Sequence, residues 1–190
     1  MNRHAIITLP NDHLRQRSKR VSAFNEKLNT LIANMESAVL DWEDNRKHEF
    51  GVALAAVQID QLHKVVVVRN NFEDKKDRSF VVMVNPKIAQ KSGEPEIDFE
   101  GCLSVPDVYG KVPRYPKVKV RALDKDGKEF MLKAEGFLAR VLQHEIDHTN
   151  GKLFVDHIKD DLEAFYRLTD EGKLEKLSAD DVKKSANILW

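Results

Sequence analysis

The chain has 190 residues, of which 42% are hydrophobic and 33% are charged, as in an ordinary globular protein with room for one large core. Lys and Arg together number 31, and so do Asp and Glu, so no excess of charge draws the chain to nucleic acid or to an anionic membrane. Cys102 is the single cysteine, which excludes an internal disulfide and fits a reducing compartment. No apolar run is long enough for a membrane helix or a signal peptide, so we expect one soluble, cytoplasmic domain over residues 1–190.

The first fifty residues predict one long helix. Before it lies a basic stretch, Arg15–Arg20; such an arm can contact RNA, but at this length we favour a solvated surface. Apolar residues then recur at helical spacing and predict an amphipathic helix from Asn25 to about Glu43. These residues are Leu28, Leu31, Ile32, Met35, Val39 and Trp42. A polar loop is expected over Asp41–Glu49.

The middle of the chain predicts strands. The small residues of Gly51–Gln58 suit a backbone that comes close to another strand or to a ligand, and taken alone they favour close packing in the core. Valine-rich Lys64–Arg69 predicts a strand, and so does Phe80–Asn85, which Pro86 closes.

A hairpin follows a turn at Ser92–Pro95. Alternating polar and apolar residues predict two strands, Lys117–Leu123 and Lys128–Lys133, with a turn between them. Beyond the next helix, Asp160–Leu168 is predicted to be helical, and residues 170–190 to be a partly exposed charged tail. The expected fold is α+β: mostly antiparallel strands packed around a central metal-binding helix, with an N-terminal and a C-terminal helix.

That central helix contains the segment Gln143–His148. Apolar residues recur at helical spacing through it, and Asn150-Gly151 supplies a stop. His144 and His148 are four residues apart, so their rings project from one face and can bind one metal ion. Glu145 lies about 100° round the helix, within reach of a metal-bound water. The pattern indicates metal-assisted hydrolysis.

Two histidines leave the metal short of a third protein ligand, because a catalytic site uses three ligands and an open position for water. The candidates are Cys102 and three downstream residues, Asp156, His157 and Glu163. Cysteine is the better candidate, since a thiolate binds soft divalent ions tightly.

The chain contains three separate motifs, in this order: Gly51–Gln58, Glu100–Ser104 and Gln143–His148. In order and separation they are similar to the three signature motifs of the peptide deformylases. The likeness runs from about Ile6 to about Ile158, and the three motifs together are highly specific. The resemblance implies a single catalytic domain that removes the N-formyl group from the starting methionine of newly made polypeptides.

The resemblance also implies the parts of the site. One divalent ion, natively Fe²⁺ and replaceable by Zn²⁺, Ni²⁺ or Co²⁺, would be held by Cys102, His144 and His148. Glu145 would be the general acid and base, and the Gln58 side chain and the Leu103 backbone N–H would stabilise the oxyanion. The residues expected to contact the substrate are Gly51, Val52, Ala53, Gly101, Tyr109, Phe137 and Val141.

This chain departs from the family pattern at two positions. Ala53 stands where the first motif usually has a second glycine, and Tyr109 occupies the region where many bacterial members have an arginine. We expect both to affect peptide affinity more than hydrolysis. Two other functions stay open: a zinc peptidase with a carboxylate as third ligand, and a deformylase-like metal-binding module. The expected partners are formylated nascent peptides with transient ribosome contact, without sequence-specific nucleic acid or membrane, and the chain is expected to be a monomer.

Overall fold

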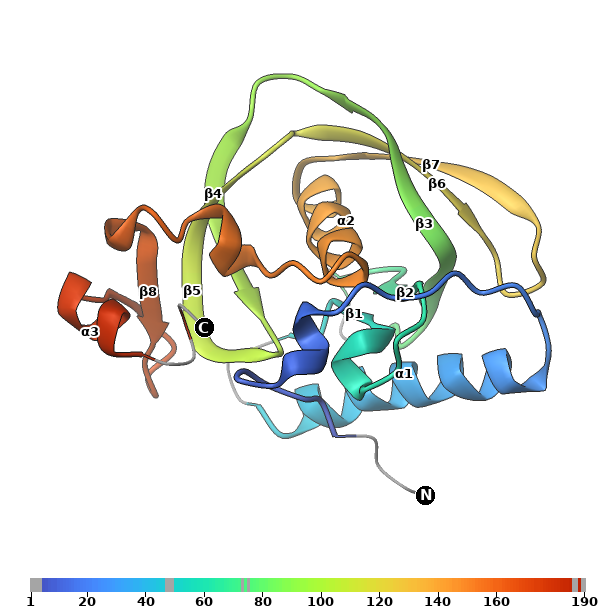
Figure 1. Cartoon of the computed structure of the whole chain (residues 1–190), viewed down its shortest axis with the longest axis horizontal. Coiled ribbons are helices and arrows are strands. Elements are labelled where there is room, and N and C mark those ends of the chain that lie inside the picture. Colours follow the sequence, from blue (N-terminus) through green and yellow to red (C-terminus); the bar gives the residue numbers. More distant parts are fainter. Residues whose placement is uncertain (1–4, 47–49, 73, 75, 186–187, 189–190) are drawn as a thin grey trace.

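The computed structural model describes residues 5–46, 50–72, 74, 76–185 and 188. Two antiparallel sheets surround one central helix, α2 (Gly136–Thr149), and α1 (Glu26–Asp44) lies along the outside of the molecule (Figure 1). A short third helix, α3 (Ala179–Lys184), lies near the C-terminal end. The expected α+β fold is confirmed. Within the described part of the chain, no helix has both the length and the apolar character needed to cross a membrane.

The larger sheet has the strand order β1-β2-β3-β6-β7. Its strands are β1 (Ala53–Ala55), β2 (Val65–Arg69), β3 (Phe80–Ser92), β6 (Lys117–Leu123) and β7 (Glu129–Glu135). The hairpin predicted at the end of this set is confirmed, with its strands paired in register from Lys117↔Glu135 to Leu123↔Glu129.

Strand β3 is longer than the sequence predicts. Pro86 was expected to end it, yet pairing with β6 continues to Ser92 after a register shift between Val84 and Lys87. Asn85, inside that irregularity, has φ of 54°. Proline is tolerated there because a bulge removes the need for its missing N–H in the ladder.

The smaller sheet has the order β4-β5-β8-β9. It comprises β4 (Glu96–Cys102), β5 (Val105–Arg114), β8 (Phe165–Leu168) and β9 (Leu174–Lys176). The helix predicted over Asp160–Leu168 is therefore wrong: one 3₁₀ turn, η4 (Leu162–Ala164), leads directly into β8. The segment forms a strand because its backbone N–H and C=O groups pair with those of β5. A helix of this length would be marginally stable by itself.

Both faces of the larger sheet are covered where β1 and β2 lie. Helix α1 begins after Asn25, whose side chain caps it by accepting from the Lys27 N–H, and it packs Ile32 and Val39 against one face. Helix α2 packs Leu142 and Ile146 against the other. Burial on both faces explains why Val65–Val68 form a continuous apolar run rather than an alternating one. The predicted N-terminal helix is confirmed; the end of the loop expected behind it, residues 47–49, lies outside the described residues.

The ends of the chain are partly as expected. Arg17, Lys19 and Arg20 are exposed, as predicted, but Arg15 is half-buried and its guanidinium lies 2.7 Å from the Asp156 carboxylate. In the C-terminal tail many residues are exposed, yet Val182 and Ile188 are buried with the core around β5 and β8. Residues 186, 187, 189 and 190 of that tail lie outside the described residues. The tail therefore contributes to packing.

Candidate metal centre

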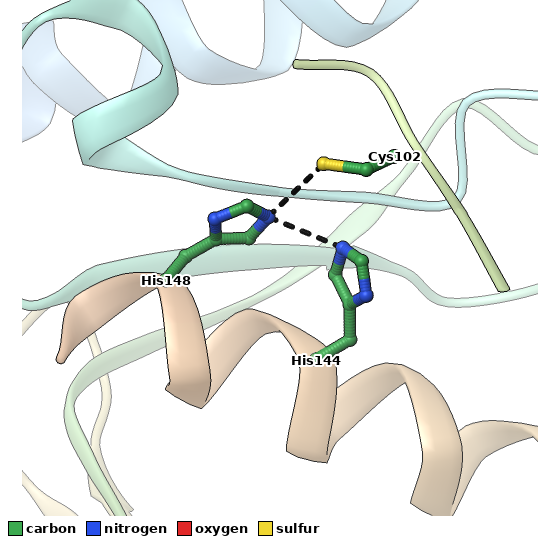
Figure 2. Close-up of side chains that lie close together, drawn as sticks. All are labelled: Cys102, His144 and His148. Atoms are coloured by element: carbon green, nitrogen blue, oxygen red, sulfur yellow. Dashed lines mark hydrogen bonds between the residues drawn. The ribbon is translucent and has the colours of Figure 1, made fainter. Parts of the chain in front are cut away.

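Helix α2 presents both histidines from one face, as their spacing predicts. His144 and His148 are 8% and 0% exposed, and their Nε2 atoms lie 3.1 Å apart. Figure 2 shows the two rings rising from adjacent turns of the helix toward the same point. Burial lowers the pKa of His148 well below its ordinary value, so this ring is neutral, the form that a metal ligand needs.

Strand β4 brings the thiol to the same point. Cys102 is the last residue of β4, and its Sγ lies 3.3 Å from Nε2 of His148 (Figure 2). The thiol sulfur and one ring nitrogen from each histidine all lie within 4.8 Å of one another. The structure thus joins one residue from a sheet edge to two residues from the central helix.

The separations of these atoms suit a single ion. Metal–nitrogen bonds of about 2.0–2.1 Å and a metal–sulfur bond of about 2.3 Å in a tetrahedral site place neighbouring ligand atoms roughly 3.3–3.6 Å apart. The measured 3.1 and 3.3 Å are within a few tenths of an ångström of this range. Thiolate sulfur with two imidazoles is a donor set that suits divalent transition metals, zinc and iron among them.

The other candidates for the third ligand lie elsewhere. Asp156 binds Arg15 and accepts a hydrogen bond from the Leu153 N–H, and Glu163 pairs with Lys176. His157 contacts Asp147 through its Nε2, at 2.7 Å. Across the described residues, Cys102 alone among the four candidates groups with the two histidines. The geometry gives no support to a peptidase with a carboxylate as third ligand.

Glu100 orients His144, a role that the sequence did not reveal. Its Oε2 lies 3.0 Å from Nδ1 of His144, and its carboxylate also accepts from the guanidinium groups of Arg114 and Arg140. Burial raises the pKa of Glu100, but the hydrogen bonds from His144 and Arg114 outweigh it and bring that pKa down to about 2. A carboxylate on the remote ring nitrogen fixes the tautomer that leaves Nε2 free for a metal. Glu100 stands inside a recognised motif, but only the fold shows what it contacts.

We expect the change Glu100→Gln to weaken metal binding by about 10–100-fold, the usual effect of losing such a supporting carboxylate. The variant also leaves Arg140, which is 7% exposed, without its carboxylate partner, while Arg114 keeps Asp147 at 2.6 Å, so its free energy of unfolding should fall. A metal titration of the purified protein measures the first effect. Glu96→Gln, an exposed change on the same strand, is the control; equal metal affinity in the two variants would contradict the assigned role.

Glu145 stands beside the three candidate ligands, on the wall of a cavity. Its side chain is 5% exposed, and its Oε2 has no hydrogen-bond partner in the described part of the chain. Burial raises the pKa of Glu145 to about 7. A carboxyl group with such a pKa can both accept and release a proton near neutral pH.

The Gln58 side chain is held in one orientation. Its Oε1 accepts a hydrogen bond of 2.9 Å from the Ala55 N–H, so its amide nitrogen faces the site. There Nε2 lies 3.1 Å from the Ser104 hydroxyl and 3.7 Å from Sγ of Cys102. Ser104, 0% exposed, is a further residue that no sequence signal marked, although it ends the second motif. A fixed donor beside the cysteine can stabilise negative charge that develops on a bound oxygen.

The cavity at the candidate metal centre has a volume of about 370 Å³. Six aromatic side chains line it: Trp42, Phe50, Phe72, Phe99, Tyr109 and Phe137. Nine further predicted residues line it: Val52, Ala53, Gln58, Gly101, Cys102, Leu103, Val141, His144 and Glu145. Gly51 lies behind this wall, where a Cβ atom would come within 2.6 Å of the Val39 side chain. Its predicted contact with substrate stays a prediction.

Gly101 allows the ring of Tyr109 to lie close to β4. The two residues are cross-strand partners, and a Cβ atom on Gly101 would come within 2.6 Å of the Tyr109 ring. Glycine is needed here for close approach, not for an unusual φ. Tyr109, in the region where an arginine was expected by resemblance, therefore contributes an aromatic wall to the cavity.

Comparisons with known proteins agree with this architecture. The family model for polypeptide deformylases matches residues 3–163. A solved peptide deformylase from Legionella pneumophila is 44% identical, with a TM-score of 0.71 over 80% of this chain and 83% of its own. A probable peptide deformylase from Synechococcus phage S-SSM7 is 40% identical, with a TM-score of 0.72 over 80% and 97%. A third, from Synechococcus elongatus in complex with actinonin, is 37% identical, with a TM-score of 0.71 over 80% and 76%.

Proposed function

The chain belongs to the polypeptide deformylase family, and from this premise we propose that it removes the formyl group from the N-terminal methionine of newly made polypeptides. One observation carries the proposal: a thiol and two imidazoles meet beside a buried carboxyl group at the wall of a cavity. A purely structural metal has no use for that carboxyl group.

Cys102, His144 and His148 would hold one divalent ion, which we propose is Fe²⁺ in the native protein and replaceable by Zn²⁺, Ni²⁺ or Co²⁺. When bound, such an ion acts as a Lewis acid and makes hydroxide available near neutral pH. Glu100 supports this site through His144, and the buried arginines hold Glu100 in place. The chain thereby supplies both the ligands and their orientation.

Glu145 moves the proton in the proposed reaction. It accepts a proton from the attacking water and later returns it to the amine that leaves from the methionine nitrogen. Its pKa of about 7, which burial raises, suits both transfers. The lack of a hydrogen-bond partner for its Oε2 among the described residues leaves an oxygen for this exchange.

Two donors would stabilise the oxygen of the formyl group. As the carbon is attacked, its carbonyl oxygen gains negative charge, and donors already in place stabilise that charge without reorganising. The Gln58 amide is fixed by Ala55, and Leu103 follows Cys102 in the turn between β4 and β5. We assign the second donor to the Leu103 backbone N–H.

The change Gln58→Leu should lower kcat by about 10²–10³-fold, as the loss of one such donor does in other hydrolases. Leucine has nearly the same volume, so we expect the site to keep its metal, although the buried Ala55 N–H loses its acceptor and the free energy of unfolding should fall. Steady-state kinetics together with metal analysis measure both quantities. Gln90→Leu, an exposed change on β3, should leave kcat unchanged, and an unchanged kcat in Gln58→Leu would remove that residue from the proposed oxyanion site.

The substrate peptide would lie between two strand edges beside the candidate metal centre. Strands β1 and β4 are edge strands of their sheets, and both contribute to the cavity wall. An extended peptide can form backbone hydrogen bonds with such edges. The methionine side chain would then occupy the apolar region next to Phe137 and Val141. We further propose that the protein acts in the cytoplasm as a monomer and meets nascent chains during transient ribosome contact.

Formate release from formyl-Met-Ala-Ser tests the proposed function. The protein is purified anaerobically and loaded in turn with Fe²⁺, Ni²⁺ and Co²⁺, and acetyl-Met-Ala-Ser serves as a control with a larger acyl group. We expect release from the formyl peptide only, together with inhibition by actinonin, the ligand present in a similar solved structure. Absence of formate with all three ions would overturn the proposal.

A further inference from the structure

We propose that Tyr166 is a positioning residue, which holds Phe99 and Tyr109 as one wall of the cavity and thereby sets affinity for the peptide residues that follow methionine. The inference rests on the proposed function. It concerns a segment outside the family match, which ends at residue 163, whereas β8 begins at Phe165. The family match therefore does not assign a role to Tyr166.

Strand β8 places Tyr166 beside two residues of the cavity wall. It pairs with β5 in the register Gly110↔Phe165 and Tyr109↔Tyr166. Phe165 points into the core and is 0% exposed, so alternation along the strand turns Tyr166 to the opposite face, beside its partner Tyr109. Burial of the Phe165 side chain in the core thus determines the face of the sheet on which the Tyr166 side chain lies.

The Tyr166 ring also contacts Phe99 on β4. The two ring centroids are 4.9 Å apart at an interplanar angle of 84°, an edge-to-face contact. The Lys111 ammonium lies 5.4 Å from each of these two ring centroids, close enough for a cation–π attraction to both. Phe99 is 37% exposed and Tyr109 is partly buried, and both line the cavity. Without Tyr166, the Phe99 ring would lose this edge-to-face neighbour, and Tyr109 would lose the side chain of its cross-strand partner.

The position of Phe99 indicates which part of a peptide this wall meets. Phe99 lies three residues before Cys102, which is roughly 10 Å along an extended strand. Phe99 is therefore the part of the wall farther from the formyl group, and we infer that it meets residues beyond the methionine. Tyr109, in contrast, pairs with Gly101 next to Cys102. A second aromatic pair, Phe72 and Phe137 at 5.2 Å, also lines the cavity. Loss of the Tyr166 contact should weaken binding of long peptides and leave the chemical step intact.

The test compares Tyr166→Ala, Tyr166→Leu and Tyr166→Phe in the full-length, metal-loaded protein. For formyl-Met-Ala-Ser we expect KM to rise about two- to tenfold in the Ala and Leu variants with kcat unchanged, the range that loss of an aromatic pair produces. For formyl-Met alone we expect no change. Tyr166→Phe keeps the ring and should restore the parent KM. Leu168→Ala, two residues along the same strand, is the matched control and should keep the parent KM.

The outcomes separate this inference from the proposed function. No formate from the parent protein would overturn both. An active parent with an unchanged tripeptide KM in Tyr166→Leu would overturn the positioning role alone. An equal loss for formyl-Met and for the tripeptide, or a loss in Leu168→Ala as large as in Tyr166→Ala, would also overturn it, because a general structural effect is not sensitive to peptide length. Tyr166→Leu keeps most of the side-chain volume, so it gives a result even where the Ala variant folds poorly.

Discussion

Glu145→Gln is expected to lower kcat for formyl-Met peptides by about 10²–10⁴-fold, the range that loss of a general base produces. Glutamine has the shape of glutamate but cannot accept the proton. Glu145 is 5% exposed and its pKa is raised to about 7 by burial, so a neutral amide costs little in that environment and the fold should be kept. Metal content should also be unchanged, since Glu145 is not among the three grouped ligand residues.

Steady-state kinetics at neutral pH, with metal analysis of the same sample, measure this effect. Glu163→Gln is a suitable control, because that carboxylate pairs with Lys176 and does not line the cavity. It should keep the parent kcat. A Glu145→Gln variant that retained its metal and its full kcat would show that another group transfers the proton.

Cys102→Ala should abolish both metal binding and formate release. Removing a supporting residue already weakens metal affinity by about 10–100-fold, and loss of a direct ligand should exceed that. Sγ of Cys102 lies 3.3 Å from His148 Nε2, and none of the other sequence-derived candidates, Asp156, His157 and Glu163, groups with the histidines in the described structure. Two imidazoles alone then remain, one ligand fewer than a catalytic metal site uses.

Metal analysis after dialysis distinguishes this expectation from that of a peptidase with a carboxylate ligand, which would keep its metal. His63→Ala, which removes an exposed histidine, controls for adventitious binding at the surface and should leave the metal content at the parent value. Thermal unfolding of the metal-free proteins shows whether Cys102→Ala still folds. A folded Cys102→Ala protein with a full complement of metal would contradict the proposed centre.

Helix α1 and the β6–β7 hairpin were predictable because their signals are local. A helical repeat of apolar residues and an Asn25 cap specify α1 within one segment. In the same way, alternation on both sides of a tight turn specifies the hairpin. Strand β8 was not predictable in this way. Its four residues carry too little periodic signal, and its pairing with β5 joins Phe165 to Gly110, which stands far earlier in the chain.

The candidate site shows the same difference between local signals, which the sequence reveals, and long-range contacts, which it does not. Spacing alone places His144 and His148 on one face of a helix, but it left four candidates for the third ligand. Glu100, Ser104 and Tyr166 had no assigned role, since each acts through a residue distant in sequence: His144, Gln58 and Phe99 respectively. Gly51 shows the opposite case, a motif residue that packs on α1 and does not line the cavity.

The sequence by itself determined the two imidazoles, the neighbouring carboxyl group and the α+β class, because helical and strand periodicities are properties of a few consecutive residues. Only the tertiary structure shows that the Cys102 thiol groups with the two imidazoles and that Glu100, held by two arginines, contacts one of these rings. It also shows that strand β8 pairs with β5 and places Tyr166 against Phe99. These features depend on strand pairing and on contacts between β4 and α2. Contacts between segments that are distant in the sequence leave no periodic pattern of residues in either segment, so the sequence alone does not reveal them.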